Sequence, residues 1–251
     1  MGSWGFGLYD SDRACDLRAS LKAVCRLPLD GPELLRVLLE NEGPPDETFW
    51  LVTADQFHKK GVVCPEARDR ALTILEKGQH PALAEQIRQH PDKKRTTLIK
   101  PQPLLMQAGE VLIYPTQNGA PPNPYLKHQD WHPDGWAALV VAEAEQLFGY
   151  LAWYRPAVAQ RLWTQPPGLA EVKAVPDWRL SHAATCSSSH YQRLAFQSLG
   201  RIQLAPHWDR HLNERMMTGR SAALSDVSIS NRMKVDARET FGKLNVGTLL
   251  I

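Results

Sequence analysis

The sequence predicts an α+β protein in which an N-terminal helical bundle is followed by a smaller β-rich domain. Apolar residues recur at helical spacing through residues 1–90. A charged, proline-containing stretch follows, and after it short apolar runs are bounded by glycine and proline, as is typical of strands. We therefore expect a helical domain at 1–90, a linker at 91–108, a β-rich domain at 109–217 and a polar C-terminal segment at 218–251.

Five helices are expected in the first domain. The first spans residues 12–27 and ends before Pro28. The second begins where Asp30 precedes a glycine and a proline, and ends at the glycine and prolines of 43–45. Asp46 caps a third helix that ends at Gly61, and the last two begin at Pro65 and Pro81. Short connections favour antiparallel neighbours, so these helices should form a bundle.

Strands are expected at 111–114, 137–142, 147–153 and within 194–204, with proline-rich loops between them. The segment from Thr218 is polar, and we expect it to be poorly ordered up to its apolar end at 249–251, which would add to a sheet.

Composition excludes several classes of protein. The longest clean apolar run, residues 136–142, is far shorter than the roughly 20 residues that span a bilayer. The four cysteines form no C-x-x-C pair, which argues against a zinc knuckle or a thioredoxin-type site. Met1 is not followed by a basic region and an apolar run, so we expect a cytoplasmic protein without membrane association. The net charge of +2 by itself argues neither for nor against nucleic-acid binding, and we expect no nucleic-acid partner.

Two blocks of residues resemble a bacterial protein family of uncharacterised domain type. Its members open with MG-x-WG-x-G, an acidic turn and D-x-A-x-D. The matching residues here are Met1, Gly2, Trp4, Gly5, Gly7, Asp10, Asp12, Ala14 and Asp16. The second block matches at Phe49, Trp50, Leu51, Ala54, Gln56, Gly61 and the run Arg68, Asp69, Arg70, Ala71 and Leu72, whereas Phe57 replaces an expected tryptophan. The resemblance covers residues 1–80 and implies no catalytic activity. It implies an immunity protein of a toxin–immunity system, as in type VI secretion and bacterial competition.

An acidic stretch fits such a role. Residues 30–55 contain one base, Arg36, and seven acids, namely Asp30, Glu33, Glu40, Glu42, Asp46, Glu47 and Asp55. Toxins that cut nucleic acid carry basic clefts, and an acidic surface would steer towards such a cleft and take the place of phosphates. A solvated helical face would have the same composition. The sequence thus predicts a toxin inhibitor, most readily of a nuclease, with these acids as candidate toxin-binding residues and with no cofactor, metal or catalytic residue.

Two other functions are compatible with the sequence. A metal-dependent hydrolase would use His128, Asp130 and His132, with Asp134 as a further ligand. The spacing of His207 and His211 also places two imidazoles on one helix face, but neither pair has the glutamate of the H-E-x-x-H motif. The run from Ser187 to His190 has the residue types of a nucleophile and a base without a G-x-S-x-G elbow. The second alternative is a non-catalytic adaptor.

Overall fold

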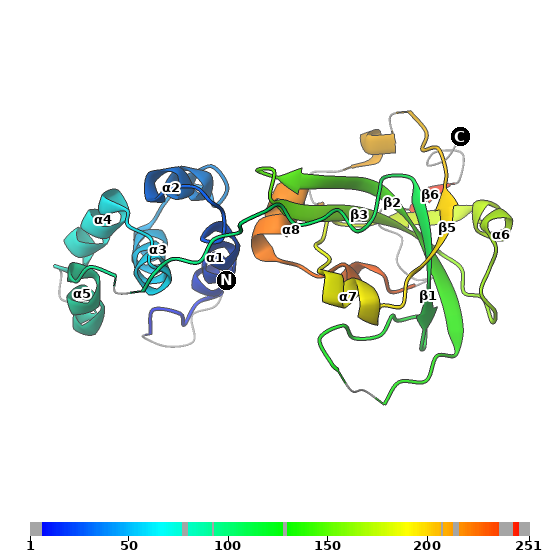
Figure 1. Cartoon of the computed structure of the whole chain (residues 1–251), viewed down its shortest axis with the longest axis horizontal. Coiled ribbons are helices and arrows are strands. Elements are labelled where there is room, and N and C mark those ends of the chain that lie inside the picture. The colour runs from blue at the N-terminus through cyan, green and yellow to red at the C-terminus, as the bar shows by residue number, and fades with distance from the viewer. Residues whose placement is uncertain are drawn as a thin grey trace. The chain divides into compact units, whose positions relative to one another are not determined.

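The computed structural model describes residues 7–76, 80–91, 93–127, 130–206, 208–212, 216–235 and 243–245. The chain divides into two compact units, coloured in sequence order in Figure 1. The helical unit comprises Met1–Lys100 with Leu224–Asp226, and the sheet unit comprises Pro101–Ala223 with Val227–Ile251. Helices gather towards the N-terminus and strands towards the C-terminus, which confirms the α+β class. The expectation of a smaller β-rich domain is wrong, because the sheet unit is the larger of the two.

The helical unit contains all five expected helices. They are α1 (Asp12–Val24), α2 (Gly31–Leu39), α3 (Glu47–Lys60), α4 (Pro65–Leu75) and α5 (Pro81–Arg88). Local sequence sets their ends: the Ser11 hydroxyl accepts from the N–H of Ala14 at the start of α1. Gly61 ends α3 with φ +72°, in the left-handed region that glycine adopts without strain. Helix α1 ends at Val24 rather than at residue 27.

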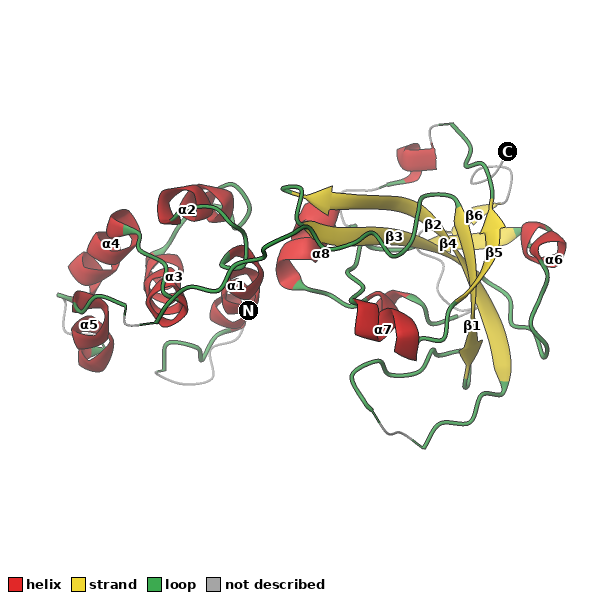
Figure 2. Ribbon diagram, viewed as in Figure 1, coloured by secondary structure: helices red, strands yellow, loops and turns green. Residues whose placement is uncertain are grey.

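The sheet unit is built on a six-stranded sheet in the order β5-β1-β2-β3-β4-β6, with every pairing antiparallel. Its strands are β1 (Glu110–Thr116), β2 (Gly135–Leu147), β3 (Leu151–Ala159), β4 (Asp177–Leu180), β5 (Gln197–Arg201) and β6 (Lys243–Asn245). Figure 2 shows the long β2–β3 hairpin at the centre of the sheet. The expected strand at 137–142 lies within β2, whereas the segment 147–153, expected as one strand, contains the turn between β2 and β3. Strand β4 was not expected.

Both faces of the sheet are buried. Along β1, Val111 and Ile113 pack into a cluster that contains Trp178, and the alternate residues Leu112 and Tyr114 pack into a second cluster. Because successive side chains of a strand point to opposite faces, the two clusters lie on opposite sides of the sheet. The second cluster also contains Ile229 and Met233, both fully buried.

The burial of Ile229 and Met233 shows that the expectation of a poorly ordered segment from Thr218 is wrong for residues 218–235. Residues 218–235 are ordered and form α8 (Gly219–Ser225) and the 3₁₀ turn η2 (Ile229–Arg232). The Ile229 N–H donates to the carbonyl of Thr185 over 2.8 Å, so this segment is tied to the sheet unit through backbone as well as side chains. The apolar end at 249–251 lies outside the described residues. The remaining short elements are α6 (Leu169–Lys173), α7 (Ser188–Arg193) and the 3₁₀ turn η1 (Trp208–His211).

The expected linker, 91–108, is attached at both ends. The Arg95 guanidinium donates to the carbonyls of Cys25, Leu27 and Leu29, and the Leu98 N–H donates to the Arg26 carbonyl over 2.8 Å. Further along, Met106 is fully buried in the sheet unit. The first half of this segment thus belongs to the helical unit and the second half to the sheet unit.

Candidate functional site

The acidic stretch lies on α2, on α3 and on the loop between them. Its exposed members are Asp30, Glu33, Glu40, Asp46 and Glu47, and Glu42 is partly exposed. These six carboxylates therefore face solvent within the helical unit. Glu42 lies in the α2–α3 loop, and Glu40 is the residue at which α2 ends.

Three of the six also stabilise helix ends. Asp30 and Glu33 form a capping box on α2, in which each carboxylate accepts from the backbone N–H of the other residue over 2.9 Å. Asp46 accepts from the Phe49 N–H over 2.8 Å and pairs with the Arg13 guanidinium over 3.0 Å. Exposed negative charge at these positions is thus partly explained by the helix ends themselves.

Asp55 does not belong to this surface. Only 2% of the residue is exposed, and its carboxylate faces the interior of the helical unit. It accepts from the Tyr9 hydroxyl, from Lys59 Nζ over 2.9 Å and from Gln86 Nε2 over 3.3 Å. Burial, together with the Asp55 carboxylate, raises the pKa of Tyr9. The residue therefore joins the segment before α1 to α3 and α5, and its inclusion among the toxin-binding candidates is wrong.

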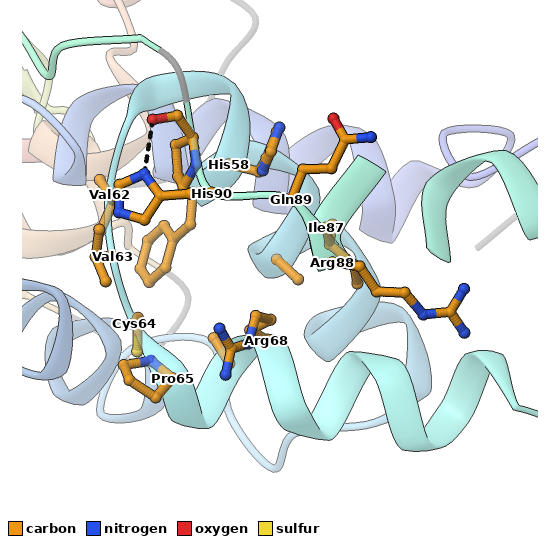
Figure 3. A pocket seen from close by; sticks show the side chains of 14 residues that line it. His58, Val62, Val63, Cys64, Pro65, Arg68, Ile87, Arg88, Gln89 and His90 are labelled. Carbon is orange, nitrogen blue, oxygen red and sulfur yellow. Dashed lines mark hydrogen bonds between the residues drawn. The ribbon is translucent and has the colours of Figure 1, made fainter. Parts of the chain in front are cut away.

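A pocket of about 150 Å³ lies at the ends of α3, α4 and α5. Figure 3 shows its apolar side, where Val62, Val63 and Ile87 line the space, and its polar rim. The cations of the rim are held by neighbouring carboxylates: Arg68 pairs with Asp69 over 3.0 Å, and Arg88 lies 3.8 Å from Glu85. A space of about this volume holds one benzene-sized group.

The chemistry of the pocket suits binding rather than nucleophilic attack. Cys64 lies in its wall next to Pro65, and His58 and His90 line another part of the pocket. Burial raises the pKa of the Cys64 thiol, so the thiol is protonated at neutral pH, and the thiolate is the reactive form. The His90 ring contacts the Pro91 carbonyl through Nδ1 over 3.1 Å, which holds the ring at the rim.

The pocket adjoins the start of the acidic stretch. Gly31, the first residue of α2, lies directly against the backbone of Val63, because a Cβ at Gly31 would stand 2.0 Å from the Val63 carbonyl oxygen. This close approach places Asp30 next to the wall of the pocket. The sequence did not predict the pocket, because its lining combines residues between 54 and 68 with residues 87–91, which lie about twenty positions later in the chain.

The candidate metal ligands are only partly described. His132 Nε2 lies 2.9 Å from Asp130 Oδ1, with 85% and 95% of the two side chains exposed, and His128 lies outside the described residues. Asp134 accepts from the Asn118 N–H over 2.8 Å, so its carboxylate already has a backbone partner. Within the described ranges, no group of three or more His, Cys, Asp or Glu residues is arranged to hold a metal ion.

The other candidate pairs have structural roles where they are described. The Ser187 hydroxyl caps α7 by accepting from the His190 N–H over 3.2 Å, and the His190 ring lies edge-on to Tyr125 at 4.6 Å between centroids. His207 and the side chain of His211 lie outside the described residues, although the backbone of His211 closes η1.

None of the helices in the described ranges is long and apolar enough to span a bilayer. No family model, no curated protein and no solved structure matches this chain.

Proposed function

We propose that the chain is a cytoplasmic binding protein that neutralises a toxic protein partner by direct contact through its helical unit. The observation that carries this proposal is the position of an exposed acidic stretch beside a preformed apolar pocket. The acids would attract a basic partner, and the pocket would receive one apolar side chain of that partner. The resemblance of residues 1–80 to immunity proteins supports the same function.

The two features would act on different steps of association. Exposed charges raise the rate of encounter with an oppositely charged surface and act over about 10 Å at 0.1 M salt. An apolar side chain inserted into a pocket acts mainly on the dissociation rate. A nuclease is the partner that fits best, since its substrate-binding cleft is basic.

Co-expression with the product of the neighbouring gene tests the proposal when that product alone arrests growth. We expect this chain to restore growth and to form a complex with the purified toxin. Two results would contradict neutralisation. One is a complex in which the toxin keeps its nuclease activity, and the other is growth arrest that this chain does not relieve.

Charge reversal at Glu40 and Glu42 tests the role of the acids, because both residues lie at or just beyond the C-terminal end of α2, where a carboxylate does not serve as an N-cap. We expect the double Glu→Lys variant to associate about tenfold more slowly with the toxin at low salt while its dissociation rate changes little. The matched control reverses Glu76 and Glu145, which are exposed acids elsewhere; Glu76 ends α4 as Glu40 ends α2. Equal slowing in both variants would show that only net charge matters.

A further inference from the structure

A second cavity in the helical unit is lined by cations. It encloses about 390 Å³ and is bordered by Lys22, Arg26, Lys60, Lys93 and Lys94, together with Cys25 and Thr96. We call these five cations and their cavity the lysine pocket. All five side chains are exposed, and no described carboxylate forms an ion pair with any of them.

The fold brings these charges together from three separate segments. Lys22 lies in the last turn of α1, Lys60 is the last residue of α3, and Lys93 and Lys94 belong to the segment after α5. Arg95 fastens that last segment to the end of α1 through the three carbonyls of residues 25, 27 and 29.

A second contact fixes the approach of Lys93 to Lys60. The Lys93 carbonyl lies against Gly61, where a Cβ would stand only 1.9 Å from the oxygen. Glycine is therefore required at this position, both for its positive φ and for the space. The backbone thus brings like charges to the border of one cavity, where a bound anion would reduce their mutual repulsion.

From this geometry we propose that the lysine pocket binds a small ligand that carries two or more phosphate groups. A volume of about 390 Å³ falls in the range of small-molecule sites, about 300–1,000 Å³. Four of the five cations are lysines, which bind phosphate as compact point charges, and the Thr96 hydroxyl supplies a further donor. None of the seven described lining residues is aromatic, so the stacking that binds single-stranded nucleic acid has no platform here.

Inorganic triphosphate is the probe for this site, in calorimetric titrations of the full chain at fixed ionic strength. The test variant is Lys93→Gln/Lys94→Gln, which removes two charges that lie on no helix and leaves the backbone contacts of residues 93 and 95 in place. We expect saturable binding of about one triphosphate per chain, weakened at least about fivefold in this variant, because an exposed charge contact contributes up to about 1 kcal/mol. The control Lys127→Gln/Lys173→Gln removes two exposed lysines of the sheet unit and should bind as the unaltered chain does.

Three results would overturn the proposal: no saturable binding, equal weakening in the control, or tight binding of a ten-nucleotide RNA that triphosphate does not displace. The last result would identify an extended nucleic-acid track instead. Circular dichroism of each variant, matched to that of the unaltered chain, ensures that weaker binding reflects lost charge rather than lost structure.

Discussion

Replacing Asp55 with alanine should destabilise the helical unit severely, although the residue lies in an acidic stretch that composition assigns to the surface. The side chain is almost fully buried and accepts from three separate segments, through Tyr9, Lys59 and Gln86. The variant leaves the Tyr9 hydroxyl and the Gln86 amide without their acceptor.

The size of the effect follows from these partners. Hydrogen bonds to a charged group contribute about 1.5–3 kcal/mol, and a buried polar group left unsatisfied costs about 1–3 kcal/mol. Lys59 loses little, because half of its side chain is exposed and water replaces the carboxylate. We expect Asp55→Ala to lower the free energy of unfolding by about 3–4 kcal/mol and Asp55→Asn by about half as much, because the amide oxygen still accepts.

Urea denaturation followed by circular dichroism at 222 nm measures this change, because α1–α5 supply most of the helical signal. With an m-value of about 1.5 kcal/mol per molar, the midpoint should fall by about 2 M urea. The control is Asp69→Ala on α4, an exposed carboxylate that pairs with Arg68 and should contribute less than about 0.5 kcal/mol. Equal midpoints for the two alanine variants would refute the structural role of Asp55.

Three further changes test other contacts. Glu143→Ala removes the partner of Arg155 Nε, 2.7 Å away, and should destabilise the sheet unit by about 3 kcal/mol in urea titrations followed by tryptophan fluorescence, because the guanidinium is only 4% exposed. Burial raises the pKa of Cys186 from 9.0 to about 12, so the unfolded chain releases a proton above pH 9 that the folded chain retains. Stability should therefore fall as pH rises from 9 to 11, less steeply in Cys186→Ala. Gly61→Ala should cost at least about 2 kcal/mol in thermal melts, from its positive φ and the clash with Lys93.

Each of these has a result that would contradict it. For the ion pair, the control is Glu145→Ala, which removes an exposed side chain on the same strand. Equal decreases in the free energy of unfolding of Glu143→Ala and Glu145→Ala would show that the buried pair does not stabilise the sheet unit. For the thiol, the contradicting result is that the unaltered chain and Cys186→Ala lose stability equally steeply as pH rises from 9 to 11. For the glycine, an unchanged melting temperature would mean that the segment around Lys93 is free to move away.

The helices were predictable because their signals are local. Asp30, Asp46 and Gly61 act on backbone groups within a few residues, and the buried stripes repeat within each helix. Strand β4 has only four residues, of which two are polar, so no run of apolar residues predicted it. Helix α7 has no fully buried residue and thus no apolar stripe to find.

The ordered structure of residues 218–235 was not predictable from the local sequence, because contacts with distant residues of the chain stabilise it. Ile229 bonds to Thr185, and the Tyr114 hydroxyl donates to the Met233 carbonyl from more than a hundred residues earlier. The burial of Asp55 has the same kind of cause. Its spacing from Lys59 is that of an exposed ion pair, while the hydroxyl that it binds lies 46 residues before it.

Helix dipoles explain part of the charge distribution in the helical unit, but not all of it. Negative charge is favoured at helix N-termini and positive charge at C-termini, which accounts for Asp30, Asp46, Lys22 and Lys60 without any partner. Glu40 ends α2, where a carboxylate is disfavoured, and Glu42 lies in the following loop.

Lys93 and Lys94 likewise lie outside any helix, yet the fold holds them against other cations. Neither lysine lies at a helix end or forms a described ion pair, so their removal should change triphosphate binding without the penalty of a lost cap. The variants at Glu40 and Glu42 test the acidic surface, and those at Lys93 and Lys94 test the lysine pocket, with the stability of each variant measured separately. Two independent surfaces would be established if the glutamate variant loses toxin association but keeps triphosphate binding and the lysine variant shows the reverse. Loss of both activities in both variants would mean that the overall charge of the unit, rather than two separate sites, determines binding.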